Sequence, residues 1–356
     1  MKKLMFVAML LVTFNLVFIG VNAEELVWGD YIYKLNGEYS SDKLQDGISI
    51  TEYNGTESIV IIPSEIDGQQ VKRIYFRAFL ENEYVQEVYI SEGIEIIDAN
   101  AFYHCANLKK VQFPTTLKYI GSEAFKWCSL EKIVIPEGVE TIRPRAFGSC
   151  ESLEHVVIPN SVDVLYPGIF YGSDNIESIV FYNPNTEIQE PRPYESKGTN
   201  YPADRKEPEF PVFSRGVPKT IYSFAGGSIE AYARENNIRF IPIANVVVDD
   251  IKLYNDMPPY IKNDRTLVPM RAIFEALGAE VSWNNETRTA TGVKGGIEVK
   301  ITIGENVLYK NGEAIELDCV AEITNDRTMV PARAISEAFG CTVNWNNEMK
   351  TVEITK

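Results

Sequence analysis

The stretch LEKIVIPEGVETIRPRAFGSC, residues 130–150, recurs along the chain with the same order of apolar, polar and proline positions. Five such units each carry an Ala-Phe or Ile-Phe pair, and successive pairs lie 23, 23, 22 and 23 residues apart. A period in the low twenties with one short strand per unit is typical of a solenoid, in which each coil buries its apolar residues against its neighbours. The pairs are Ala78-Phe79, Ala101-Phe102, Ala124-Phe125, Ala146-Phe147 and Ile169-Phe170.

These units resemble the leucine-rich repeats of BspA-like bacterial and protozoan surface antigens, over roughly residues 31–243. The resemblance implies a secreted or surface-displayed protein that binds a partner and performs no catalysis. We therefore predict a leucine-rich repeat solenoid of short strands and irregular coils over residues 71–243.

The start of the chain has the order of a secretory signal. Lys2 and Lys3 precede an apolar run from Leu4 to Val21, and small residues before Glu24 suit a signal peptidase. We expect residues 1–23 to be removed and the mature chain to be extracellular or on the cell surface, with no membrane span. The alternative is an uncleaved membrane anchor. The apolar run is about as long as the shortest helix that can span a membrane.

The two ends of the solenoid need covers, because an end coil otherwise exposes its core. Residues 24–70 have short strand patterns outside the coil period, and we predict that they form an amino-terminal β cap. A strand, a Gly-Gly turn, a helix and a last strand over 220–243 predict the carboxyl-terminal cap. Between the coils and this cap, a proline-rich insertion at about 187–212 displaces Phe213, which resembles the next Phe of the series.

Three cysteines, Cys105, Cys128 and Cys150, each lie three residues after a repeat Phe. Disulfides are permitted outside the cell, and stacked strands bring such a column within range. An in-register column points its side chains in parallel, however, so we favour small buried residues packed coil on coil.

The strand of each coil alternates, so every second side chain must face outward from the core. These outward positions are free to meet a partner while the fold stays fixed, although a row of valines is also ordinary strand composition. We predict that a protein or glycan partner binds this outward face. The predicted binding residues are Tyr89, Gln112, Val134, Val157 and Val180, with Lys110, Lys132 and His155 beside them.

A second repeat fills the remainder. Residues 263–289 and 325–351 align at a constant offset of 62, with 18 of 27 residues identical. In each copy a short strand runs to Pro269 or Pro331, where proline suits a first helical turn, and a helix follows to Gly278 or Gly340. We predict a duplicated α+β domain over residues 246–356.

The phrases R-T-x-V-P-x-R-A-I and W-N-N-E in both copies closely resemble the copper amine oxidase amino-terminal domain, often called the stalk domain. In the amine oxidases, the part that these copies resemble is an appendage without the copper or the quinone. The chain has two histidines, His104 and His155, both in the solenoid, whereas copper needs about three imidazoles. We therefore expect no cofactor and no metal.

Paired arginines in the two copies, Arg265 with Arg327 and Arg271 with Arg333, suggest either an anion site or ion pairs to Glu275 and Glu337. We favour ion pairs that join strand to helix within each copy. The same domain holds Cys319 and Cys341, which could form a disulfide or remain free thiols.

A net charge of −16 makes nucleic acid an improbable partner, since phosphate binding needs a basic surface. No nucleophile elbow, Cys-x-x-Cys pair, His-Glu-x-x-His helix or phosphate loop occurs, so we assign no catalytic residue. The sequence indicates a non-enzymatic binding or adhesion protein. The alternatives are a structural component that binds a cell-wall polymer through residues 246–356 and, with less support, a secreted hydrolase.

Overall fold

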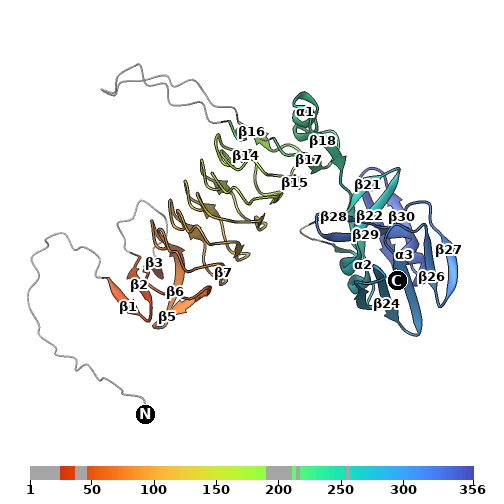
Figure 1. Ribbon diagram of the computed structural model, residues 1–356, viewed down its shortest axis with the longest axis horizontal. Helices are drawn as coiled ribbons and strands as arrows, with labels where there is room; N and C mark the ends of the chain where they lie inside the picture. Colours follow the sequence, from red (N-terminus) through yellow and green to blue (C-terminus); the bar gives the residue numbers. More distant parts are fainter. Residues whose placement is uncertain (1–24, 37–45, 190–210, 214–216, 254–256) are drawn as a thin grey trace, which may run out of the picture.

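The computed structural model describes residues 25–36, 46–189, 211–213, 217–253 and 257–356 (Figure 1). A stack of coils comes first, and a mostly β domain with two helices follows. The predicted fold class, a leucine-rich repeat solenoid followed by a duplicated domain, is confirmed. The expected signal at 1–23 and most of the expected insertion at 187–212 lie outside the described residues.

One side of the solenoid is a parallel array of strands that we call the front face. A three-stranded sheet begins it, and a five-stranded sheet continues it. The amide of Glu131 donates to the carbonyl of Lys109 at 3.2 Å where the two sheets meet. The front-face strands are β4 (Ile59–Ile62), β7 (Glu87–Ile90), β9 (Lys110–Gln112), β11 (Lys132–Val134), β13 (His155–Ile158), β15 (Ser178–Phe181), β17 (Thr220–Ser223) and β18 (Arg239–Pro242).

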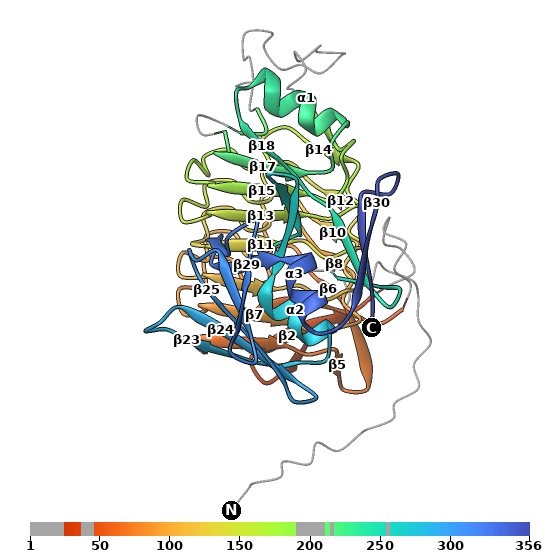
Figure 2. The ribbon, with the colours of Figure 1, turned by 90° about the vertical axis from the view of Figure 1, so that its right-hand side faces the viewer.

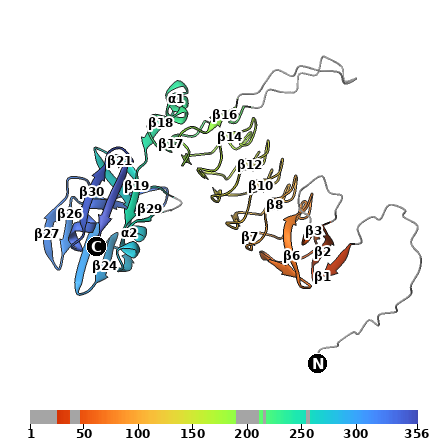
Figure 3. The same ribbon diagram turned by 180° about the vertical axis from the view of Figure 1, so that it is seen from behind.

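The opposite side carries a shorter strand in each coil, as the view from behind shows (Figure 3). These strands also pair in parallel, with Ile97, Ile120 and Ile142 in register and fully buried. The opposite strands are β6 (Gln69–Ile74), β8 (Ile96–Ile97), β10 (Tyr119–Ile120), β12 (Thr141–Ile142), β14 (Val164–Leu165) and β16 (Glu187–Ile188).

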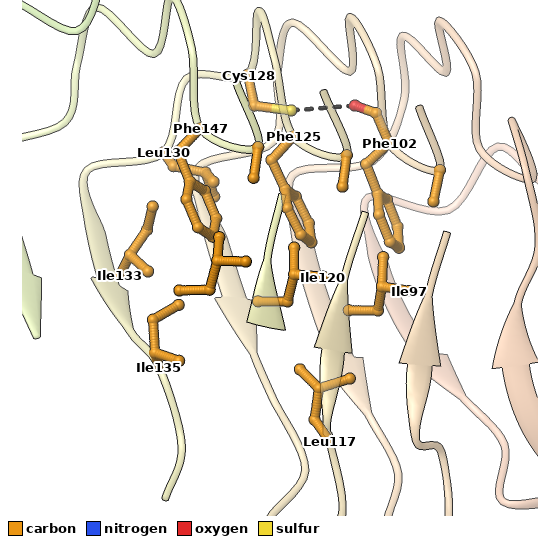
Figure 4. Packing of buried hydrophobic residues seen from close by; sticks show 14 of the residues in the cluster. Ile97, Phe102, Leu117, Ile120, Phe125, Cys128, Leu130, Ile133, Ile135 and Phe147 are labelled. Carbon is orange, nitrogen blue, oxygen red and sulfur yellow. Dashed lines mark hydrogen bonds between the residues drawn. The ribbon is translucent and has the colours of Figure 1, made fainter. Parts of the chain in front are cut away.

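Between the two sides, the repeat phenylalanines stack ring on ring (Figure 4). Centroid separations run from 4.6 Å, between Phe79 and Phe102, to 6.1 Å, between Phe147 and Phe170. Phe213 lies 5.8 Å from Phe170 and nearly parallel to it, so the prediction that it resumes the series is confirmed.

Backbone hydrogen bonds between neighbouring coils recur with the same period as the phenylalanine rings. The amide of Phe79 donates to the carbonyl of Ala101 at 2.7 Å, and the amide of Phe102 donates to Ala124 in the same way. Each coil also turns twice through positive φ, at 57° in Glu123 and 67° in Trp127 for example, a conformation that non-glycine residues rarely adopt. The stack must therefore offset this local strain at every repeat.

The cysteine column packs as we favoured. Cys105, Cys128 and Cys150 are fully or almost fully buried as free thiols. Cys128 Sγ donates to the carbonyl oxygen of Phe102 at 3.2 Å, which joins one coil to the previous one (Figure 4). Burial raises the pKa of the Cys150 thiol to about 12, so this group stays protonated and unreactive.

Antiparallel strands cover the amino-terminal end of the stack. The ring of Tyr53 lies 4.8 Å from that of Phe79, and the ring of Tyr31 lies 5.0 Å from that of Tyr53, so tyrosines extend the aromatic series. The strand containing Tyr53 then pairs in parallel with β6. The cap strands are β1 (Leu26–Trp28), β2 (Tyr31–Leu35), β3 (Ile48–Tyr53) and β5 (Glu65–Ile66).

The helix α1 (Ser228–Glu235) lies over the other end of the stack, between β17 and β18. Its buried side chains, Ile229 and Ala233, join the same core as the coils. Gly226, at φ +92°, makes the turn before the helix.

The second domain is built around the pairing of its two copies. Strand β22 of the first copy pairs antiparallel with β29 of the second, and Val268 lies opposite Val330 at the centre. The strands and helices are β19 (Asn245–Val248), β20 (Ile251–Lys252), β21 (Tyr260–Lys262), β22 (Arg265–Pro269), α2 (Met270–Ala276), β23 (Glu280–Asn284), β24 (Thr289–Lys294), β25 (Ile297–Thr302), β26 (Val307–Lys310), β27 (Glu313–Glu316), β28 (Glu322–Thr324), β29 (Arg327–Pro331), α3 (Ala332–Ala338), β30 (Thr342–Asn346) and β31 (Thr351–Thr355).

The helix boundaries follow the sequence signals. Pro269 and Pro331 immediately precede the first helical residue of α2 and α3. Gly278 and Gly340 have φ of +81° and +84°, which confirms the predicted left-handed stops. Residues of both helices pack into one apolar cluster, separate from that of the coils.

We predict that Phe125→Ala destabilises the solenoid by about 3–5 kcal/mol, because the change leaves a cavity between two stacked rings. Urea unfolding followed by circular dichroism measures the cost. Tyr84→Ala, at an exposed position of the same coils, is the control and should cost far less. If both variants lost the same free energy of unfolding, the aromatic stack would not be a main source of the stability of the solenoid.

Candidate functional site

The predicted outward residues form two columns on the front face. In the first column, which we call the apolar column, Tyr89 lies opposite Gln112 in the first sheet, and Val134, Val157 and Val180 lie in register with one another in the second. In the second, Glu87 lies opposite Lys110, Lys132 opposite His155, and His155 opposite Ser178. The in-register arrangement expected from the sequence is thus present along the strands.

The apolar column differs sharply in exposure along its length. Val134 is 40% exposed, whereas Val157 and Val180 are only 4% and 2% exposed. All three point away from the coil core, as their alternation requires. The expectation that Val157 and Val180 face solvent is nevertheless wrong, because another part of the chain covers them.

The cover is the second domain, which lies against the carboxyl-terminal strands of the front face (Figures 1 and 2). Val157 and Val180 belong to one buried apolar cluster that spans both domains. From the front face this cluster includes Val157, Val180 and Tyr222, and from the second domain it includes Met257, Tyr260, Leu267, Cys319 and Met329.

A hydrogen bond and a pair of aromatic rings cross this interface. Asn325 Nδ2 donates to Ser178 Oγ at 2.8 Å. The rings of Tyr222 and Tyr260 have centroids 5.7 Å apart, and the Tyr260 hydroxyl donates to Glu322 at 2.6 Å. Burial raises the pKa of both phenols, that of Tyr222 to about 12, so both hydroxyls stay protonated and can donate.

His155 lies at the edge of the interface. Its Nδ1 is 3.0 Å from Ser178 Oγ, the same oxygen that accepts from Asn325. Burial, and then the nearby charge of Lys132, lower the pKa of the imidazole below its usual value of 6.5, while Glu154, Asp326 and Glu177 oppose this. His155 is therefore part of the joint between the domains and is a weaker candidate for a partner contact than the sequence suggested.

The amino-terminal half of the front face remains open. Lys110 Nζ donates to Glu87 at 3.2 Å and to the Tyr89 hydroxyl at 2.8 Å, and that hydroxyl donates to Glu87 at 2.7 Å. The bond from Tyr89, followed by that from Lys110, lowers the pKa of the Glu87 carboxyl. The three side chains thus hold one another in fixed positions next to the apolar column.

A hollow of about 430 Å³ lies where the open half ends. Strands β9 and β11 contribute Gln112, Val134, Lys110 and Lys132, and the second domain contributes Arg327. Four of the predicted binding residues therefore line one concave site, with a wall from a domain that the sequence did not place there.

Three contributors were missed from the sequence. Ile59 and Ile61 of β4 are exposed, and Ile61 lies opposite Tyr89, so the apolar column extends one strand further. These two residues fall in the range 24–70, which was predicted to form the cap, and the alternation of exposed and buried residues along Ile59–Ile62 would have revealed the outward side chains. No sequence signal links Arg327 to the solenoid.

The predicted strand-to-helix ion pairs within each copy are wrong in detail. Arg265 of β22 donates to Asp318, which lies in the segment after β27. Arg333 pairs with Glu337 one turn later in α3, with 3.9 Å between Nε and Oε1. A charged side chain of the first copy, Arg265, therefore contacts the segment between the copies, whereas Arg333 of the second copy contacts its own helix.

Cys319 and Cys341, for which a disulfide was left open, are free and buried thiols. Among the described residues, no three His, Cys, Asp or Glu side chains gather to hold a metal ion. Residues 247–354 contain no histidine, so this part of the chain does not fit copper. In the part of the chain that the structure describes, no helix is long and apolar enough to cross a membrane.

Comparison with known families matches both parts of the chain. Residues 72–195 match the BspA type leucine rich repeat region, in six copies. Residues 247–354 match the copper amine oxidase N-terminal domain. The resemblances inferred from the sequence are thereby confirmed. No curated protein matches the chain.

Several solved structures are similar to parts of the chain. A leucine rich cell surface protein from Faecalibacterium prausnitzii is 25% identical, over 44% of this chain and 39% of that one, with a TM-score of 0.39. The T. pallidum leucine rich repeat protein is 23% identical, over 61% and 98%, with a TM-score of 0.42. The pneumococcal vaccine antigen PcpA is 17% identical, over 55% and 44%, with a TM-score of 0.41. This chain thus spans less than half of the first and third proteins.

We predict that stability falls as the pH drops from about 7.5 to about 5.5, across the usual histidine pKa. The native pKa of His155 is lowered, so the unfolded chain binds a proton that the folded chain resists, and stability is lost on acidification. His155→Gln should make the decline shallower in thermal unfolding. His104→Gln is the matched control, and an equal flattening by that change would refute the assignment.

Proposed function

Because residues 72–195 are a BspA type leucine rich repeat region and residues 247–354 are a copper amine oxidase N-terminal domain, we propose that the chain is a non-catalytic binding protein. Its partner, a protein or a glycan, binds the open half of the front face. The observation that carries this proposal is the exposed part of the apolar column, which ends at the wall formed by the second domain.

The open half has the properties of a docking surface. Its strands are parallel and in register, so the outward side chains have fixed spacing and a partner need not order them. Ile61 and Val134 offer apolar area that the fold itself leaves exposed. Tyr89 adds a ring whose hydroxyl is already hydrogen-bonded, and interfaces commonly use such amphipathic side chains.

Charge narrows the kind of partner. The hollow beside Val134 is lined by Lys109, Lys110, Lys132 and Arg327, with Glu131 as its acidic member. Glu87 pairs with Lys110 next to the hollow, so basic side chains outnumber acidic ones by four to two. This positive site stands out in a chain of net charge −16. Complementary charge speeds association and selects among partners, so a partner with an acidic edge is favoured here.

Export and surface location are part of the proposal. They rest on the basic, apolar and small-residue order of residues 1–23. A binding role fits a front face whose side chains have no duty in the coil core. In this account the second domain closes one end of the partner site and also covers the part of the front face that the partner does not use.

Val134→Glu should weaken partner binding at least about tenfold, because it places a charge in the apolar column without entering either core. Pull-down from envelope and host-matrix fractions would identify a partner, and surface plasmon resonance would give Kd for each variant. Val293→Glu is the matched control, since Val293 is 43% exposed on a strand of the second domain. If Val134→Glu bound the partner as tightly as the parent does, the partner would not bind the front face.

A further inference from the structure

The second domain contains a groove of about 790 Å³ that shares no residue with the front face. It is lined by the end of β27 and the segment that follows it, by β30 and by α3. Its volume is in the range of small-molecule sites, which is about 300–1,000 Å³. The polar and aromatic lining includes Trp345, Asn344, Asn347, Arg333, Glu337 and Asp318.

Trp345 gives the groove an apolar platform. It lies on β30 opposite the buried Val352, and 38% of the residue remains exposed. Ile315 of β27 also lines the groove and is exposed. Two such side chains that flank one concavity form an apolar surface that the domain core does not use.

The charges in the groove are nearly balanced. Arg265 is paired with Asp318, and Arg333 with Glu337, so each guanidinium already has a carboxylate beside it. A polyanion would therefore meet carboxylates as well as cations, and it would gain little. An uncharged ligand rich in hydroxyl groups suits the site better, because each hydroxyl both donates and accepts hydrogen bonds.

The geometry points to a neutral saccharide as the ligand of this groove. One apolar face of a sugar ring would stack on Trp345, and its hydroxyls would bond to the Arg333–Glu337 pair and to Asn347, whose Oδ1 also accepts from Lys350 at 2.9 Å. This site is independent of the front face. It would give the chain a second binding function, in which the second domain holds a glycan while the coils hold the partner proposed above.

The duplication supplies an internal control. Trp283 is the equivalent residue of the first copy, with 36% exposed and a position opposite Ala290 on its own hairpin. Its Nε1 donates to Asn285 at 2.6 Å. Trp283 is not among the residues that line the groove, whereas Trp345 is. The two tryptophans thus share a structural setting and differ in their access to this site.

The test uses the mature full chain and two soluble probes, the tetrasaccharides of N-acetylglucosamine and of glucose. Isothermal titration calorimetry gives the affinity, and the indole N–H signals of ¹⁵N-tryptophan-labelled protein report which ring is touched. We expect saturable binding of at least one probe, with a shift of the Trp345 signal. Trp345→Ala should weaken binding at least about tenfold, while Trp283→Ala binds as the parent does.

Three results would overturn the proposal. The first is no binding of either probe at millimolar concentration, and the second is an equal loss of binding in Trp283→Ala and Trp345→Ala. The third is displacement of a bound tetrasaccharide by an unrelated extended peptide, which would assign the groove to a peptide. Because Val134→Glu leaves this groove untouched, failure here is distinguishable from failure of the front-face partner site.

Discussion

The stacking of one coil on the next is the interaction on which the rest of the structure depends. Each coil contributes one ring to the phenylalanine series, and three successive coils each contribute a cysteine that donates to the previous coil, as Cys128 does to Phe102. No coil could bury these groups alone, so stability arises between neighbours and the two ends must be covered. Tyr53 continues the rings at one end, and Ile229 of α1 closes the core at the other.

Stacking also determines what the surface can do. Parallel strands place every second side chain on the front face, and the core of the coils places no demand on those positions. The chain uses the two halves of this face differently. Val157 and Val180 bind the second domain, whereas Ile61 and Val134 stay exposed next to a site rich in lysine. One repeated surface thus serves as a domain joint and as the proposed partner site.

Local rules predicted most of the fold, because the coil period and the duplicated helix signals are short-range patterns. The Ala-Phe phase located the core, and Gly278 marked the end of its helix. Alternation identified Val157 as outward but could not show what lies beyond it. Val157 is covered by a cluster that includes Tyr260, which lies far away in the sequence. A contact between such distant segments leaves no periodic pattern in the sequence. Arg327 and the groove beside Trp345 went unpredicted for the same reason, because each is made by segments brought together only in the folded chain.

The central claim is that the second domain sits on the front face in solution. Ser178 and Asn325 test it most directly, since their side chains are hydrogen-bonded at 2.8 Å across the joint while the native cysteines are buried. A Ser178→Cys/Asn325→Cys variant should be joined within one chain by a short bismaleimide crosslinker, detected by mass spectrometry of a proteolytic digest, because the hydrogen bond places the two side chains within its reach. The account predicts nearly complete crosslinking at low protein concentration. Two thiols that remain free, or that crosslink only between molecules, would contradict it.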